Sequence, residues 1–84
     1  MVVIRNVDEV IKGLIKIEED DILPKSIKIK LRTAIEVLTN GPEGIDLRVS
    51  KSLEELGDVA EDPNVPDYAR TQIWRIVSLL ESEK

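Results

Sequence analysis

Apolar residues recur at every third or fourth position along four stretches of the chain. The four apolar stripes run from Val3 to Ile17, from Ile27 to Leu38, from Ile45 to Ala60 and from Ala69 to Leu80. This spacing matches the period of an amphipathic helix, about 3.6 residues, and none of the stretches alternates as a half-buried strand does. The pattern predicts an all-α chain with four helices, near residues 3–19, 24–39, 44–60 and 66–82.

Three turn signals separate the stripes. They are Asp20-Asp21-Ile22-Leu23-Pro24, Asn40-Gly41-Pro42-Glu43-Gly44 and Asp62-Pro63-Asn64-Val65-Pro66. Proline and glycine interrupt helices, so each signal predicts a short loop. Short loops between helices make sequential helices antiparallel neighbours.

The chain also contains an internal repeat. A shift of 66 − 24 = 42 positions places Pro24 on Pro66, Leu14 on Leu56 and Leu38 on Leu80. The 84 residues therefore read as one helical domain of two hairpins, with repeat 1 at about 3–40 and repeat 2 at about 45–82. Neither hairpin can bury its stripe alone. A small four-helix bundle built from two antiparallel hairpins is predicted, and a two-repeat α-solenoid fragment remains open.

Three motifs in the second half resemble a known family. They are Asp62-Pro63-Asn64-Val65-Pro66, Ala69-Arg70-Thr71-Gln72-Ile73-Trp74 and Ser78-Leu79-Leu80-Glu81. Together they are similar to the C-terminal signature of UPF0147, an uncharacterised archaeal protein family, although Val65 stands where a longer apolar residue is expected. The resemblance implies a four-helix fold and an archaeal, cytosolic origin. It implies no activity.

The chain has no cysteine and no histidine. Zinc ribbons, disulfide frameworks and Cys–His or Ser–His nucleophile pairs are therefore excluded, and no glycine-rich phosphate loop precedes a helix. We expect no cofactor, no catalytic residues and no enzyme activity. With 12 basic and 17 acidic residues the net charge is −5, which disfavours nucleic acid as a partner.

The apolar stretches are too short for a membrane-spanning helix or the core of a signal peptide. We therefore expect a cytoplasmic protein with no membrane partner. Lysine and glutamate are abundant, whereas the chain has a single glutamine, Gln72. That balance favours a thermophilic source.

Acidic residues precede two of the predicted loops. In a bundle, Glu18, Glu19, Asp20 and Asp21 would approach Glu61 and Asp62 at one end. Such carboxylates suit a hard cation, held by Asp20, Asp21, Glu61 and Asp62. The favoured alternative is helix capping, in which Asn64 and Asp67 resemble a capping box.

Two further residues sit unusually on the predicted helices. Glu18 falls at the apolar angle of the first helix, where the second repeat has Ala60. Exposure at the helix end is favoured over partial burial beside a cation. Gly57 flanks the apolar stripe of the third helix, which predicts close approach of a neighbouring helix.

Three apolar residues point away from the predicted core or lie at its edge. Ile29 and Leu47 face opposite to their own stripes, and Trp74 lies at the stripe's edge, where the first repeat has Arg32. These residues are candidate interaction positions, with packing at the core edge as the alternative. Lys25, Lys28 and Arg32 share one side of the second helix, which is read as a solvated basic face that can also dock on an acidic patch.

The leading hypothesis is a non-enzymatic helical interaction module that associates with itself, as a homodimer, or docks on a protein partner. The alternative is a domain that binds a cation or a small ligand through the acidic loops, Glu18 to Asp21 with Glu61 and Asp62. An enzyme ranks third, because nothing pairs the remaining carboxylates, lysines or Tyr68 at one site.

Overall fold

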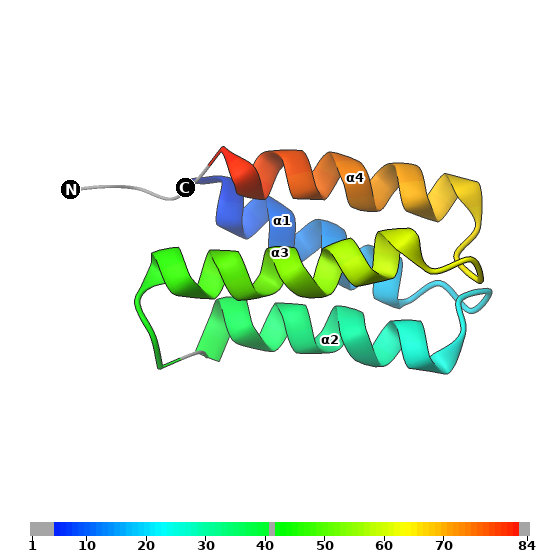
Figure 1. Cartoon of the computed structure of the whole chain (residues 1–84), viewed down its shortest axis with the longest axis horizontal. Helices are drawn as coiled ribbons and strands as arrows, with labels where there is room; N and C mark the ends of the chain where they lie inside the picture. Colours follow the sequence, from blue (N-terminus) through cyan, green and yellow to red (C-terminus); the bar gives the residue numbers. More distant parts are fainter. Residues whose placement is uncertain (1–4, 41, 83–84) are drawn as a thin grey trace.

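The computed structural model describes residues 5–40 and 42–82, with side chains from Val7 onward, and these residues form four helices (Figure 1). The helices are α1 (Arg5–Glu18), α2 (Lys25–Asn40), α3 (Ile45–Glu61) and α4 (Asp67–Glu81). No strand occurs within the described ranges, so the all-α prediction is confirmed. The expected start of the first helix, at residues 3 and 4, lies outside the described residues, and the other boundaries differ from expectation by one residue.

The helices close into a ring of four antiparallel pairs. α1 packs against α2 and α4, and α3 packs against the same two helices. In the described part of the chain, no close backbone approach joins α1 to α3 or α2 to α4. Stacked solenoid hairpins would place α1 beside α3, so the ring identifies a four-helix bundle and removes the solenoid alternative.

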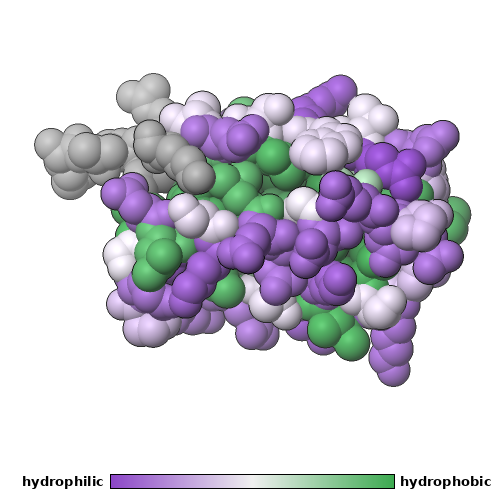
Figure 2. All heavy atoms as spheres, in the orientation of Figure 1, coloured by the Kyte–Doolittle hydropathy of each residue, from purple (hydrophilic) through white to green (hydrophobic). Residues whose placement is uncertain are grey.

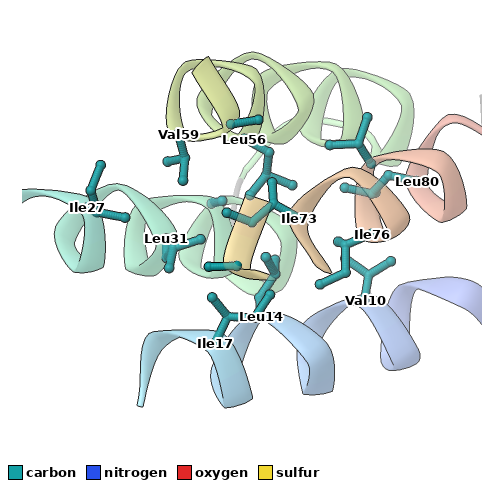
Figure 3. Close-up of a cluster of buried hydrophobic side chains, with 14 of the residues drawn as sticks. Val10, Leu14, Ile17, Ile27, Leu31, Leu56, Val59, Ile73, Ile76 and Leu80 are labelled. Atoms are coloured by element: carbon teal, nitrogen blue, oxygen red, sulfur yellow. The ribbon is translucent and has the colours of Figure 1, made fainter. Parts of the chain in front are cut away.

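The apolar stripes meet inside the ring. Figure 3 shows side chains of all four helices converging there, among them Leu14, Leu31, Leu56 and Ile73. The buried apolar residues of the helices are Val10, Leu14, Ile17, Ile27, Leu31, Ala34, Leu38, Val49, Leu56, Val59, Ala60, Ala69, Ile73, Ile76, Val77 and Leu80. Each fully buried Leu, Ile or Val contributes about 1.5–3 kcal/mol to folding. The predicted stripes therefore form the core.

The α1–α2 and α3–α4 loops share one hydrogen-bond pattern. The Oδ1 atom of Asp20 accepts the backbone N–H of Ile22 at 2.9 Å, and the Oδ1 atom of Asp62 accepts that of Asn64 at 2.8 Å. The second pair lies 42 positions after the first, which matches the shift of the sequence repeat. Each aspartate side chain thereby folds its own loop back toward the next helix.

The one buried polar side chain among the described residues is Ser52 of α3. Its hydroxyl donates to the carbonyl of Ala34 on α2 at 3.1 Å. A buried hydroxyl without a partner would be costly, and this bond satisfies it while joining the two hairpins.

The two helical glycines, Gly13 and Gly57, have different surroundings. A Cβ atom added to Gly13 of α1 would lie 3.0 Å from Cδ1 of Ile76 on α4, so Gly13 permits the close approach of these helices. A Cβ atom added to Gly57 of α3 would meet nothing within 4 Å. The prediction that Gly57 marks a close approach is wrong, because the distance between helix axes, which the stripe does not show, decides where a side chain fits.

Candidate functional site

The acidic residues do lie at one end of the bundle. The α1–α2 loop and the α3–α4 loop are side by side at the right-hand end of Figure 1. The hydroxyl of Tyr68, in the first turn of α4, donates to the Oδ2 atom of Asp20 in the other loop. This bond joins the first repeat to the second at the acidic end.

The same bond sets the acidity of both groups. Hydrogen bonding from Tyr68, and then from the N–H of Ile22, lowers the pKa of Asp20 below its ordinary value. The pKa of Tyr68 is raised, mainly because its proton is shared with Asp20. Asp20 is therefore an ionised acceptor at neutral pH, and its two carboxylate oxygens already accept a hydrogen bond each.

The six acidic residues do not assemble into a metal centre. Within residues 5–40 and 42–82, no three acidic side chains group as a bound ion would require. Asp21 instead lies 3.8 Å from the ammonium of Lys28, and Asp62 holds the N–H of Asn64. These contacts are structural, so the geometry supports loop closure in place of a site formed by Asp20, Asp21, Glu61 and Asp62.

The capping assignment needs a correction. Asn64 does not cap α4: its backbone N–H donates to Asp62, and Pro66 occupies the N-cap position without a side-chain hydrogen bond. The predicted capping box of Asn64 and Asp67 is therefore wrong. The Oδ1 atom of Asp67 instead accepts a hydrogen bond from Nη1 of Arg70 at 2.9 Å.

Arg70 secures the α3–α4 loop. Its Nε donates to the carbonyl of Ala60 at 2.8 Å, and its Nη2 donates to the carbonyls of Asp62 and Val65 at 3.0 and 3.1 Å. One guanidinium thus holds the end of α3 and the loop that follows. The first repeat has Lys28 at this position, whose ammonium has no such fork.

Glu18 is paired, contrary to the favoured expectation. Its Oε1 atom accepts Nη2 of Arg32 on α2 at 2.7 Å and Nε of the same residue at 3.2 Å. The side chain of Glu18 is 19% exposed, so the expectation of simple exposure at the helix end is wrong and the alternative with a cationic partner holds. The sequence indicated that Glu18 lies on the apolar side of α1. The packing of α1 on α2 then brings Arg32 within ion-pair distance of Glu18.

Trp74 lies on α4 and is 48% exposed. The bond from Arg70 to the carbonyl of Ala60 fixes the level at which α4 meets α3. Trp74 follows Arg70 by four residues, and Gly57 precedes Ala60 by three. Because the helices are antiparallel, one turn along each brings Trp74 and Gly57 to the same level.

Gly57 leaves open space on α3 near this level, since a Cβ atom added there would meet nothing within 4 Å. Leu53 and Val77 lie one turn away from Gly57 and Trp74 on the same helix faces and pack on the core. We call Leu53, Gly57 and Trp74 the Trp74 surface. Figure 2 shows apolar atoms exposed along the boundary between α4 and α3.

The first hairpin is built differently at the same positions. Forty-two residues earlier, Ile15, Glu18 and Arg32 replace Gly57, Ala60 and Trp74. There the ion pair of Glu18 with Arg32 spans the two helices. Gly57, Ala60 and Trp74 on α3 and α4 thus correspond to a charged bridge between α1 and α2.

The other two predicted interaction residues are exposed but lie elsewhere. Ile29 on α2 is 55% exposed and Leu47 in the first turn of α3 is 49% exposed. α2 and α4 lie diagonally across the bundle, and Leu47 precedes Gly57 by ten residues, about 15 Å along the helix. The structure therefore does not gather Ile29, Leu47 and Trp74 into one surface.

A groove that sequence reasoning missed runs between α1 and α4. Its volume is about 560 Å³, and Gly13, Ile17, Ile76 and Leu79 supply its apolar lining. Glu9 lines it on α1, while Glu19, Asp20 and Tyr68 bring it to the acidic end. Lys16 and Arg75 also line it. The missing side chain of Gly13 was the signal in the sequence that could have indicated it.

Comparison with known proteins places this chain in a family. The model of an uncharacterised protein family, UPF0147, matches residues 4–82. The chain belongs to this family. The resemblance drawn from residues 62–81 is therefore confirmed.

Curated UPF0147 proteins of archaea, some of them thermophiles, match most of the chain. The protein of Pyrococcus furiosus is 32% identical over 100% of this chain and 96% of its own length. That of Methanocaldococcus jannaschii is 39% identical over 92% of this chain and 87% of its own length. The match to the protein of Methanothermobacter thermautotrophicus, 38% identical, covers 79% of this chain and 65% of that protein.

Two solved structures have the same fold. The crystal structure of a UPF0147 protein from Thermoplasma acidophilum has a TM-score of 0.89 at 31% identity and covers 95% of this chain and 94% of that one. A crystal structure of a protein of unknown function has a TM-score of 0.87 at 35% identity and covers 94% of this chain and 90% of that one. The four-helix fold implied by UPF0147 membership is thus confirmed.

UPF0147 membership assigns no activity, because the family and both solved relatives are described as uncharacterised or of unknown function. None of the four helices has the length and apolar character that crossing a bilayer requires. Function must therefore be argued from the surfaces of this chain.

Proposed function

We propose that this UPF0147 protein is a non-enzymatic interaction module of the cytoplasm that docks on another protein through the Trp74 surface. The observation that supports it is the half-exposed indole of Trp74 beside the open space at Gly57. Tryptophan is enriched among the residues that dominate protein interfaces, because it offers a large apolar area with little side-chain freedom.

Packing at the core edge accounts less well for Trp74. Ala60 and Val77 are buried even though nearly half of Trp74 remains in water. The first hairpin closes the same position with an ion pair and needs no indole. The exposed apolar area of Trp74 therefore favours a partner.

The proposal is tested with the variant Trp74→Arg, which installs the residue that the first hairpin has. Ile29→Arg is the matched control, because Ile29 is similarly exposed but lies on α2. Both variants should retain the helical circular dichroism spectrum. Wild type and each variant serve as bait in an archaeal lysate, and a protein captured by wild type is then purified and titrated by calorimetry.

We expect the purified partner to bind wild type and Ile29→Arg alike and to bind Trp74→Arg at least about tenfold more weakly, since loss of one hot-spot residue costs 2 kcal/mol or more. Equal binding of Trp74→Arg would overturn the proposal. Sedimentation tests self-association. If wild type sediments as a homodimer and Ile29→Glu sediments as a monomer, the partner is a second copy of this chain, bound through Ile29.

The groove between α1 and α4 supports a second candidate function, binding of a small ligand. Its volume of about 560 Å³ and apolar lining are typical of ligand pockets. The acidic residues of its lining, Glu9, Glu19 and Asp20, outnumber the basic ones, Lys16 and Arg75, which favours an apolar ligand with an ammonium group. A higher melting temperature with 1-naphthylmethylamine than with 1-naphthylacetate would support this function, and equal melting temperatures would refute it.

A further inference from the structure

The charges around the Trp74 surface are mostly negative. We consider positions one or two helical turns from Trp74 on α4 and from Gly57 on α3, which share their faces. The charged residues at these positions are Glu54, Glu61, Asp67, Glu81 and Arg70, giving a net charge of −4 + 1 = −3. All four acidic side chains are exposed.

The single cation in this set is already engaged. Arg70 donates to three backbone carbonyls and to the carboxylate of Asp67. Glu54, Glu61 and Glu81 form no ion pair with another described residue. The Trp74 surface is therefore an exposed apolar surface bordered by three carboxylates that pair with no described cation.

The fold does not require this charge. At the equivalent positions of the first hairpin, including Arg32, four basic residues balance four acidic ones. They are Lys12, Lys25, Lys28 and Arg32 with Asp8, Glu18, Glu19 and Glu36. Two hairpins of the same backbone thus carry a net charge of 0 and of −3 at the same places.

Deepening the proposed function on which it rests, we propose that the Trp74 surface binds a basic amphipathic helix of the partner protein. An exposed apolar surface on two neighbouring helices suits the apolar face of a third helix, whose side chains lie against Trp74 and in the space at Gly57. Its lysine or arginine side chains lie against Glu54, Glu61 and Glu81, and an arginine also stacks on the indole.

The charge disfavours other occupants. A second copy docked through the same surface would place a net charge of −3 against a net charge of −3. Nucleic acid or an anionic membrane would place phosphates against these carboxylates. A basic protein segment is the occupant whose charge matches.

The test uses two synthetic amphipathic peptides that share a leucine face and carry either lysine or glutamate on the polar face. Trp74 is the single tryptophan of the chain, so its fluorescence reports binding at this surface directly. The variants are Glu54→Lys, beside the surface, and Glu36→Lys on α2, which changes the net charge of the protein equally. Gly57→Leu fills the open space at Gly57 and keeps Trp74 as the fluorescent reporter.

We expect the lysine peptide to bind, the glutamate peptide to bind at least about tenfold more weakly, and salt to weaken the lysine peptide. Glu54→Lys should reduce affinity about five- to tenfold, whereas Glu36→Lys should leave it nearly unchanged. Gly57→Leu should abolish the fluorescence change.

Equal loss of affinity in Glu54→Lys and Glu36→Lys would show nonspecific attraction to an acidic protein and overturn the inference. If neither the lysine peptide nor the glutamate peptide binds, the inference is also overturned. If both peptides bind equally and Gly57→Leu still prevents binding, a basic helix is wrong but docking at the Trp74 surface stands. The proposed function itself fails if the captured partner binds Trp74→Arg as it binds wild type.

Discussion

Arg70 offers the sharpest test of how the second hairpin is held together. The change Arg70→Lys keeps the positive charge and installs the type of residue that the first repeat has, Lys28. The carbonyl of Ala60 lies in the last turn of α3, where no following helical residue donates an N–H to it. It accepts a hydrogen bond from the Nε of Arg70 instead. A lysine ammonium at the end of a flexible stem cannot reach three carbonyls at once.

The expected cost follows from those bonds. A hydrogen bond to a charged donor contributes about 1.5–3 kcal/mol when well buried. A lysine could keep one of the three bonds to carbonyls, so two bonds are lost. Because the side chain of Arg70 is 30% exposed, each lost bond should contribute about 1.5 kcal/mol or less. We discount the Asp67 contact, because that carboxylate is fully exposed. Arg70→Lys should therefore destabilise the fold by about 2 kcal/mol.

The assay is guanidinium unfolding followed by circular dichroism, which gives the free energy of unfolding of each protein. Arg75→Lys is the matched control on the same helix, because Arg75 is exposed and makes no hydrogen bond with another described residue. It should change stability by less than about 0.5 kcal/mol. If Arg70→Lys costs no more than Arg75→Lys, the guanidinium does not hold the loop.

Three further predictions concern stability. Gly57→Ala should stabilise the fold by about 0.5–1 kcal/mol, because the added methyl group meets nothing, whereas Gly13→Ala should gain less or destabilise; equal effects in guanidinium unfolding would contradict the two geometries. Tyr68→Phe removes the main cause of the lowered Asp20 pKa, so wild type should be more stable than the variant at neutral pH. That advantage should disappear as pH falls below the ordinary value of 3.8 and the carboxylate takes up its proton, and melting curves that differ equally at acid and neutral pH would oppose this. A double-mutant cycle of Glu18→Gln and Arg32→Gln should give a coupling of about 0.5–1 kcal/mol that salt reduces, and a coupling near zero would mean that the ion pair is incidental.

The helices and the core could be predicted because they depend on local signals. Leu14, Leu31, Leu56 and Ile73 follow a helical period, and prolines and glycines mark where each helix stops. The family signature near the C-terminus pointed to the same fold. Local periodicity was therefore sufficient to predict the four helices and the core, whereas only the packing of α1 on α4 separates the bundle from stacked solenoid hairpins.

The contacts between helices were beyond such signals. The stripe showed that Glu18 lies at an apolar angle, but which cation reaches it depends on the offset of α2 along α1. The same limit applied to Gly13 and Gly57, since a glycine permits close approach only where two helix axes come near. The groove between α1 and α4 is lined by residues that lie far apart in the sequence, so it appeared only in three dimensions.

The repeat separates what the fold requires from what it leaves free. Pro24 and Pro66, or Asp20 and Asp62, stay the same in both hairpins because one loop geometry needs them. Ile15, Glu18 and Arg32 of the first hairpin correspond to Gly57, Ala60 and Trp74 of the second, so an ion pair is replaced by an exposed indole. Both sets leave an intact hairpin, so packing alone does not demand Trp74. A large apolar side chain that the fold can replace with a salt bridge, and that remains half in water, is best explained by a contact outside the chain.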